Sequence, residues 1–72
     1  MENFTQLNEE LHTLFGFGLD PTEFEALNTE DQDYCLIIIR ELIKDAKKGI
    51  KHKISIHEML TDAPSIKKSL NL

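Results

Sequence analysis

One cysteine and three histidines are the residues of this chain whose types could support catalysis or metal binding. Cys35 lies in an unbroken apolar run, Tyr34–Ile39. A nucleophilic cysteine needs an exposed thiol with a lowered pKa. Cys35 instead falls on the apolar face of a predicted helix, where a free cysteine usually packs as a small hydrophobe. We therefore expect Cys35 to be a core residue and not a nucleophile.

The histidines do not form a pattern that indicates catalysis or a metal centre. His12 lies at the edge of an apolar helical stripe, and His52 and His57 are five residues apart, so they do not share one helical face. No Cys/His spacing matches a zinc site, and no glycine-rich phosphate loop follows a strand. No nucleophile, base and orienting group can be placed together. The sequence predicts a non-enzyme with no metal, no cofactor and no evident small-molecule substrate.

A basic connector is the second candidate for chemistry. Five cationic or potentially cationic residues occur within seven positions: Lys47, Lys48, Lys51, His52 and Lys53. The segment could be a helix-turn-helix or a loop that contacts phosphates, or a solvated loop beside a helix C-terminus. It is longer than the usual turn of a helix-turn-helix. The helix expected after it offers only His57 for reading bases or phosphates.

Charge is divided unevenly along the chain. Residues 1–39 contain nine acidic residues and no Lys or Arg, a formal charge of −9, whereas residues 40–72 contain eight basic and four acidic residues, a charge of +4. This asymmetry can steer partners or favour self-association. The carboxylates could also mimic a nucleic-acid backbone or dock on a basic surface, or they could simply keep the protein soluble.

The elements that would position these residues are helices. Residues 3–15 form an amphipathic pattern that Asn3 and Gln6 can cap and Gly16 can end. A short helix should begin at Asp20-Pro21, with Glu23 closing a capping box. Its flanking residues Leu19 and Phe24 stand where a hydrophobic staple would place them.

The long central helix is predicted over residues 30–48. Thr29 with Gln32 forms its expected capping box, and Gly49 is its expected end. The run Cys35–Ile39 could also be a buried strand because it is rich in isoleucine. We favour the helix, since the run lies within a capped segment of helical length and no partner strand is evident.

Two shorter helices are expected after the connector Ile50–Ile54. Ser55 and Glu58 predict a capped helix to about Asp62. Ala63 precedes a proline, which disfavours a helical conformation there, and a last helical turn is expected over residues 64–70. The segment Ile54–Leu72 resembles short capped helical modules in general, and it indicates no family.

On the central helix one side chain breaks the amphipathic pattern. Around the axis, Ile37 falls in the middle of the polar face, about 200° from Cys35, and Tyr34 lies near its edge at about 260°. A contact patch formed by Tyr34, Ile37 and Glu41 would explain this placement. Alternatively, another helix of the same chain covers Ile37.

These patterns predict one all-α domain over residues 1–72, a small bundle of four to five helices around the long one. With one cysteine there can be no intramolecular disulfide, which suits a reducing compartment. The first fifteen residues contain no Lys or Arg, unlike a signal peptide, and the longest apolar run is too short to span a bilayer. We expect a cytoplasmic protein.

The core is expected to comprise twenty side chains: Phe4, Leu7, Leu11, Leu14, Phe15, Leu19, Phe24, Leu27, Cys35, Leu36, Ile38, Ile39, Leu42, Ile43, Ala46, Ile54, Met59, Leu60, Ile66 and Leu70. The expected function is a small protein–protein interaction module. It would be a regulator, inhibitor or immunity-like protein that binds another protein or a second copy of itself. The alternative is a nucleic-acid-binding regulator that uses the basic connector.

Overall fold

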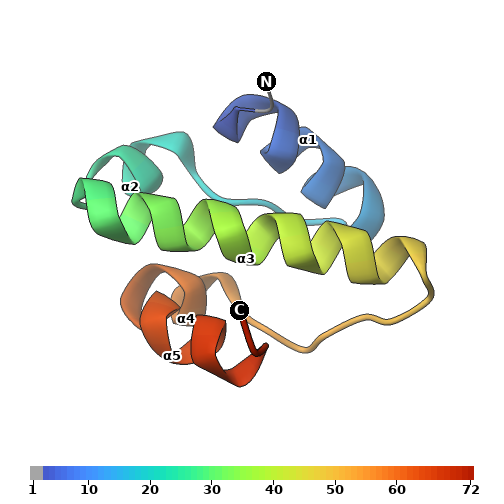
Figure 1. Cartoon of the computed structure of the whole chain (residues 1–72). Helices are drawn as coiled ribbons and strands as arrows, with labels where there is room; N and C mark the ends of the chain where they lie inside the picture. The colour runs from blue at the N-terminus through green and yellow to red at the C-terminus, as the bar shows by residue number, and fades with distance from the viewer. Residues whose placement is uncertain (1–2) are drawn as a thin grey trace.

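The computed structural model describes residues 3–72 as five helices and no strand, which confirms the all-α prediction. The helices are α1 (Phe4–Phe15), α2 (Pro21–Glu25), α3 (Thr29–Lys47), α4 (Ile56–Thr61) and α5 (Ala63–Ser69). Figure 1 shows α3 running through the middle, with α1 and α2 on one side and α4 and α5 on the other. The predicted long central helix is therefore the element that both halves of the chain contact.

Helix α1 begins and ends as its sequence predicts. The Asn3 side chain accepts a hydrogen bond from the Gln6 backbone N–H at 3.0 Å, and Gln6 Oε1 accepts from the Asn3 N–H. These bonds satisfy backbone donors that the first helical turn leaves unpaired. Gly16 follows the helix with a φ of 78°, a conformation that glycine adopts without steric cost.

The expected capping box of α2 is only half formed. Asp20 accepts a hydrogen bond from the Thr22 N–H at 2.8 Å, and Pro21 occupies the first turn. Glu23 is exposed and makes no return bond to the cap. The Asp20 bond satisfies one of the backbone N–H groups that the first turn leaves unpaired.

Helix α3 begins at Thr29, one residue earlier than a Thr29 cap would imply, because Asn28 and not Thr29 is its N-cap. The Asn28 side chain accepts from the Asp31 N–H at 2.8 Å, and its backbone has the extended conformation that an N-cap requires. At the other end the N–H groups of Gly49 and Ile50 bond to the carbonyls of Ala46 and Asp45. This is a Schellman motif, and Gly49 supplies its left-handed residue with a φ of 87°.

The C-terminal pair of helices departs from the prediction at Ala63. We expected the residue before Pro64 to be non-helical, but Ala63 is the first residue of α5 and is buried. Proline is tolerated here because the first turn of a helix needs no N–H from that position. The Ser55 cap is confirmed, since Ser55 Oγ accepts from the Glu58 N–H at 3.1 Å.

The core lies on both sides of α3, which packs against α1, α4 and α5. Within residues 3–72, eleven of the twelve buried hydrophobic side chains were predicted, and Ala63 was missed. They are Leu7, Leu11, Leu19, Phe24, Cys35, Ile38, Ile39, Leu42, Ile43, Met59 and Ile66. The other predicted core residues are only partly buried, and all of them except Ala46 pack against this cluster. Partial burial is common in a domain this small because its surface is large relative to its volume.

One polar side chain, Asn8, is buried and holds the loop between α1 and α2. Its Nδ2 donates to the Leu19 carbonyl at 2.9 Å, and its Oδ1 accepts from the Leu19 N–H at 2.8 Å. A Cβ atom on Gly18 would lie 2.5 Å from the His12 ring and 2.6 Å from Asn8 Oδ1. Glycine at position 18 therefore allows the loop to approach α1 closely enough for both bonds.

Replacing Asn8 with alanine should destabilise the fold by about 2–4 kcal/mol, because two backbone groups of Leu19 would lose their partners in a buried position. Urea denaturation followed by circular dichroism measures this. Thr13→Ala is the matched control, since Thr13 is exposed on the same helix, and a change within about 0.5 kcal/mol is expected. Equal stability of Asn8→Ala and wild type would contradict the role assigned to Asn8.

The only thiol of the chain is fully buried and points toward α4. Cys35 Sγ donates to the Met59 carbonyl at 3.3 Å, and the residue is 0 % exposed. Burial, with a smaller contribution from the charge of Asp31, raises the pKa of the Cys35 thiol from 9.0 to about 11. The thiol is therefore protonated at neutral pH, and a raised pKa is opposite to what a nucleophilic cysteine requires.

The raised pKa of Cys35 predicts a loss of stability at alkaline pH. The folded state favours the protonated thiol, so this contribution is complete below pH 9 and is lost as pH rises toward about 11. The free energy of unfolding, measured by urea denaturation at several pH values from 8 to 11, should decrease more steeply with pH for wild type than for Cys35→Ala. The same dependence of the unfolding free energy on pH in the two proteins would contradict the prediction.

Candidate functional site

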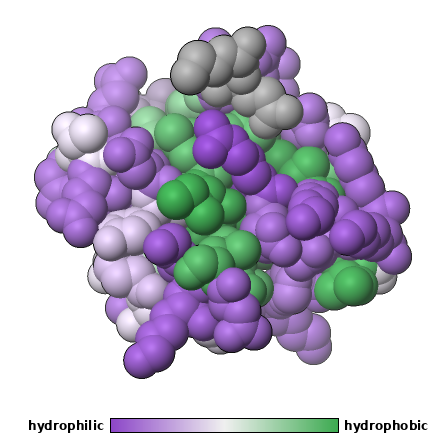
Figure 2. All heavy atoms as spheres, viewed as in Figure 1, coloured by the Kyte–Doolittle hydropathy of each residue, from purple (hydrophilic) through white to green (hydrophobic). Residues whose placement is uncertain are grey.

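One side of α3 is not covered by any other helix of the described chain. In Figure 1, α1 and α2 lie above α3 and α4 and α5 lie below it, and no other helix is drawn across α3 itself. In the same view, Figure 2 shows hydrophobic atoms exposed near the centre of this face, with hydrophilic atoms around them. The helical repeat places seven residues on this side, and we call them together the α3 strip. They are Glu30, Asp33, Tyr34, Ile37, Arg40, Glu41 and Lys44.

At the centre of the strip, Ile37 differs from the other large hydrophobic side chains of α3. Those side chains belong to the buried core or pack against it. Ile37 is only partly buried and does not pack against the core cluster. Whether Ile37 belongs to a contact patch, one of the two interpretations given for it above, stays a prediction.

Tyr34, which we placed in the same patch, is partly a core residue. It packs against the core cluster. Its hydroxyl donates to Glu30 Oε1 at 3.2 Å, and Lys67 Nζ of α5 lies 5.3 Å from the ring centroid. The hydrogen bond to Glu30 and the charge of that carboxylate raise the pKa of the Tyr34 hydroxyl. Tyr34 is therefore held in place at the edge of the strip that faces α5.

The charged residues of the strip are sorted along the helix. Glu30 and Asp33 lie exposed toward its N-terminus, and Arg40 and Lys44 lie exposed toward its C-terminus. Glu41 is partly buried, with its Oε2 4.0 Å from Lys44 Nζ. The strip thus has an acidic end, an apolar centre and a mainly basic end.

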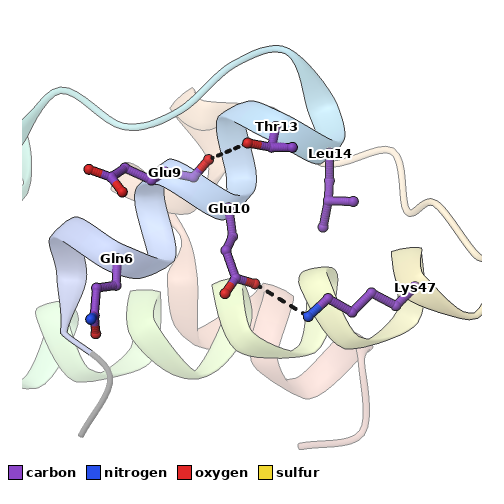
Figure 3. A pocket seen from close by; sticks show the side chains of 6 residues that line it. All are labelled: Gln6, Glu9, Glu10, Thr13, Leu14 and Lys47. Carbon is purple, nitrogen blue, oxygen red and sulfur yellow. Dashed lines mark hydrogen bonds and ion pairs between the residues drawn. The ribbon is translucent and has the colours of Figure 1, made fainter.

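A groove between α1 and α3 was not predicted from the sequence. It is lined by Gln6, Glu9, Glu10, Thr13, Leu14 and Lys47. Figure 3 shows Glu10 and Lys47 reaching toward each other across it, and their carboxylate and ammonium groups are 3.5 Å apart. No sequence signal relates Glu10 to Lys47, because the two residues are far apart in the chain and meet only when α1 packs on α3.

The groove contains carboxylate, hydroxyl and ammonium groups at its surface, and its one ion pair is exposed. Thr13 Oγ1 donates to the Glu9 carbonyl at 3.1 Å, so this hydroxyl is used within the helix. A second hollow continues from Glu10 and Lys47 to Arg40, Lys44 and Lys48, beside the α3 strip. These groups could recognise complementary charges on a partner, and they do not include a nucleophile with an adjacent base.

The basic connector does not bring its five predicted residues to one point. Lys47 pairs with Glu10, and His52 Nε2 lies 2.7 Å from Asp45 Oδ2. Lys51 Nζ donates to the Leu14 carbonyl at 3.3 Å and lies 5.8 Å from the centre of the Phe15 ring. Lys48 and Lys53 are exposed. Three of the five residues therefore contact other parts of this chain, and nucleic-acid contact by the connector stays a prediction.

Two further statements hold for residues 3–72 as a whole. This part of the chain has no group of three or more His, Cys, Asp or Glu side chains placed to hold a metal ion. None of its helices combines the length and the apolar character that crossing a membrane demands.

Comparisons of the chain with protein-family models, with curated proteins and with solved structures return no match.

Proposed function

We propose that this chain is a non-enzymatic protein-binding module and that the α3 strip is its contact surface. The observation that carries the proposal is the position of Ile37, a partly buried side chain that does not pack against the core cluster. The helical repeat places it at the centre of the α3 strip. An apolar centre within a polar rim is the usual composition of a protein–protein interface. The strip has this composition, since Tyr34 and Ile37 are bordered by charged residues.

Charges around Ile37 would contribute selectivity more than affinity. Glu30 and Asp33 would favour basic groups on a partner, and Arg40 and Lys44 would favour acidic groups. A small regulator, inhibitor or immunity-like protein acts by occupying a surface in this way. A cytoplasmic location belongs to the same proposal, because a single cysteine offers no disulfide framework.

Ile37→Glu should weaken protein binding by tenfold or more, because a charge would replace the apolar centre of the interface. We would use the tagged wild-type chain to capture binding proteins, identify them, and titrate each purified protein by calorimetry. Helical circular dichroism should be unchanged, and stability should change by about 0.5 kcal/mol or less, because Ile37 lies outside the core.

Ile50→Glu is the matched control for this substitution. Ile50 is also an isoleucine and is 52 % exposed, but it lies in the connector after α3. Binding should survive in Ile50→Glu and be lost in Ile37→Glu. The proposal is wrong if Ile37→Glu binds every partner, including a second copy, as tightly as wild type does. Unfolding of Ile37→Glu would show that Ile37 is structural.

The same proposal predicts no appreciable affinity for nucleic acid. Titration with generic duplex DNA at low salt should detect no complex. A connector that contacts phosphates would instead give binding that weakens steeply with salt, by about 0.9 logarithmic units per contact for each tenfold rise. Replacing Lys51 and Lys53 with alanine should then reduce that slope. Such a result would favour the nucleic-acid alternative.

A further inference from the structure

The α3 strip is complementary to itself when its direction is reversed. Glu30, Ile37 and Lys44 are spaced by seven residues, so each charge is about 10.5 Å along the axis from Ile37 and on the same side of the helix. Two copies of α3 that run antiparallel and meet at Ile37 would place Glu30 of each copy opposite Lys44 of the other.

The residues along the two edges of the strip are also placed opposite complementary residues when two copies run antiparallel. Asp33 and Arg40 lie on one edge, and Tyr34 and Glu41 lie on the other, by the rotation of about 100° per residue. A twofold axis through the contact at Ile37 returns each edge to itself in reverse order. Asp33 therefore approaches Arg40 of the second copy, and the Tyr34 hydroxyl approaches Glu41 of the second copy.

This arrangement keeps like charges apart. Asp33 and Glu41 are each four residues from Ile37 and would face each other if they shared an edge. They lie on opposite edges, so neither meets the other across the axis. Four charged residues of the strip thus face an opposite charge of the second copy: Glu30, Asp33, Arg40 and Lys44. Glu41 faces Tyr34 and keeps Lys44 of its own helix as its charged neighbour.

We propose that the occupant of the α3 strip is a second copy of this chain, in a twofold dimer with antiparallel α3 helices centred on Ile37. This inference rests on the proposed function, since it names the partner of the same surface. Its basis is the charge complementarity of the strip with its own reverse, and an interface shared by two copies must be self-complementary in this way. A single strip about 21 Å long makes a small interface, so the dimer should be weak and in rapid exchange.

Charge reversal tests the pairing of Glu30 with Lys44. In Glu30→Lys, and separately in Lys44→Glu, both symmetric pairs become repulsive, and the dissociation constant should rise about tenfold. An equimolar mixture of the two variants should recover wild-type affinity, because each repulsive pair becomes attractive in the mixed dimer. Sedimentation equilibrium measures all three samples, and circular dichroism checks that each variant is folded.

Glu23→Lys and Lys68→Glu are matched controls for the charge change. Both residues are exposed and lie on α2 and α5, away from the strip, so each variant should dimerise as wild type does. A dimer that survives both reversals in the strip, or a mixture that does not recover affinity, would overturn the proposal.

Cross-linking tests the position of the twofold axis without any change of charge. In Ile37→Cys the two new thiols would meet at the axis, and a glutathione redox buffer should yield a disulfide-linked dimer at low protein concentration. Ile50→Cys is the control, since its exposed thiol lies outside the strip. Equal cross-linking of the two variants would contradict the central position of Ile37.

The dimer and the proposed function fail in different ways. A wild-type chain that is monomeric at every concentration overturns the dimer, while capture of another protein in an Ile37-dependent manner would still uphold the binding module. If Ile37→Glu weakens neither self-association nor capture, both are overturned.

Discussion

The structure depends on burying the broad apolar face of α3 on two sides at once. Helix α3 has nineteen residues, more than any other helix of residues 3–72, and it contacts α1 on one side and the α4–α5 pair on the other. Leu42 and Ile43 are almost fully buried, and Ile38 and Ile39 are completely so. A chain this small needs such a shared central element, because two separate cores would each be too small to be stable.

The two-sided packing also explains why a third side of α3 stays open. The short helices can cover only part of its circumference, and the uncovered part bears the α3 strip (Figure 1). Ile37 is partly exposed there, although it lies in the middle of the most apolar segment of the chain. A hydrophobic residue in that position costs solubility, and a binding surface is one reason for a sequence to keep it.

The separation of acidic and basic residues along α3 affects both the stability of the helix and the surface that it exposes. Acidic residues in the first turn and lysines in the last turn stabilise the helix through its dipole. The same sorting makes the exposed strip acidic at one end and basic at the other. A helix stabilised in this manner is complementary to an antiparallel copy of itself, so one pattern can favour both folding and self-association.

The sequence by itself determined the helices, most of their caps and nearly all of the core, because capping and amphipathic spacing act between residues close in the chain. Asn3, Gly16, Ser55 and Gly49 all have their predicted roles. Only the tertiary structure decided what joins distant segments: the bonds of Asn8 to Leu19, the Glu10–Lys47 pair, and the dispersal of the basic connector onto Asp45 and α1. The tertiary structure also decided that Ala63 is buried. These contacts depend on how helices pack, and no local pattern specifies that a given polar side chain will meet a backbone group eleven residues away.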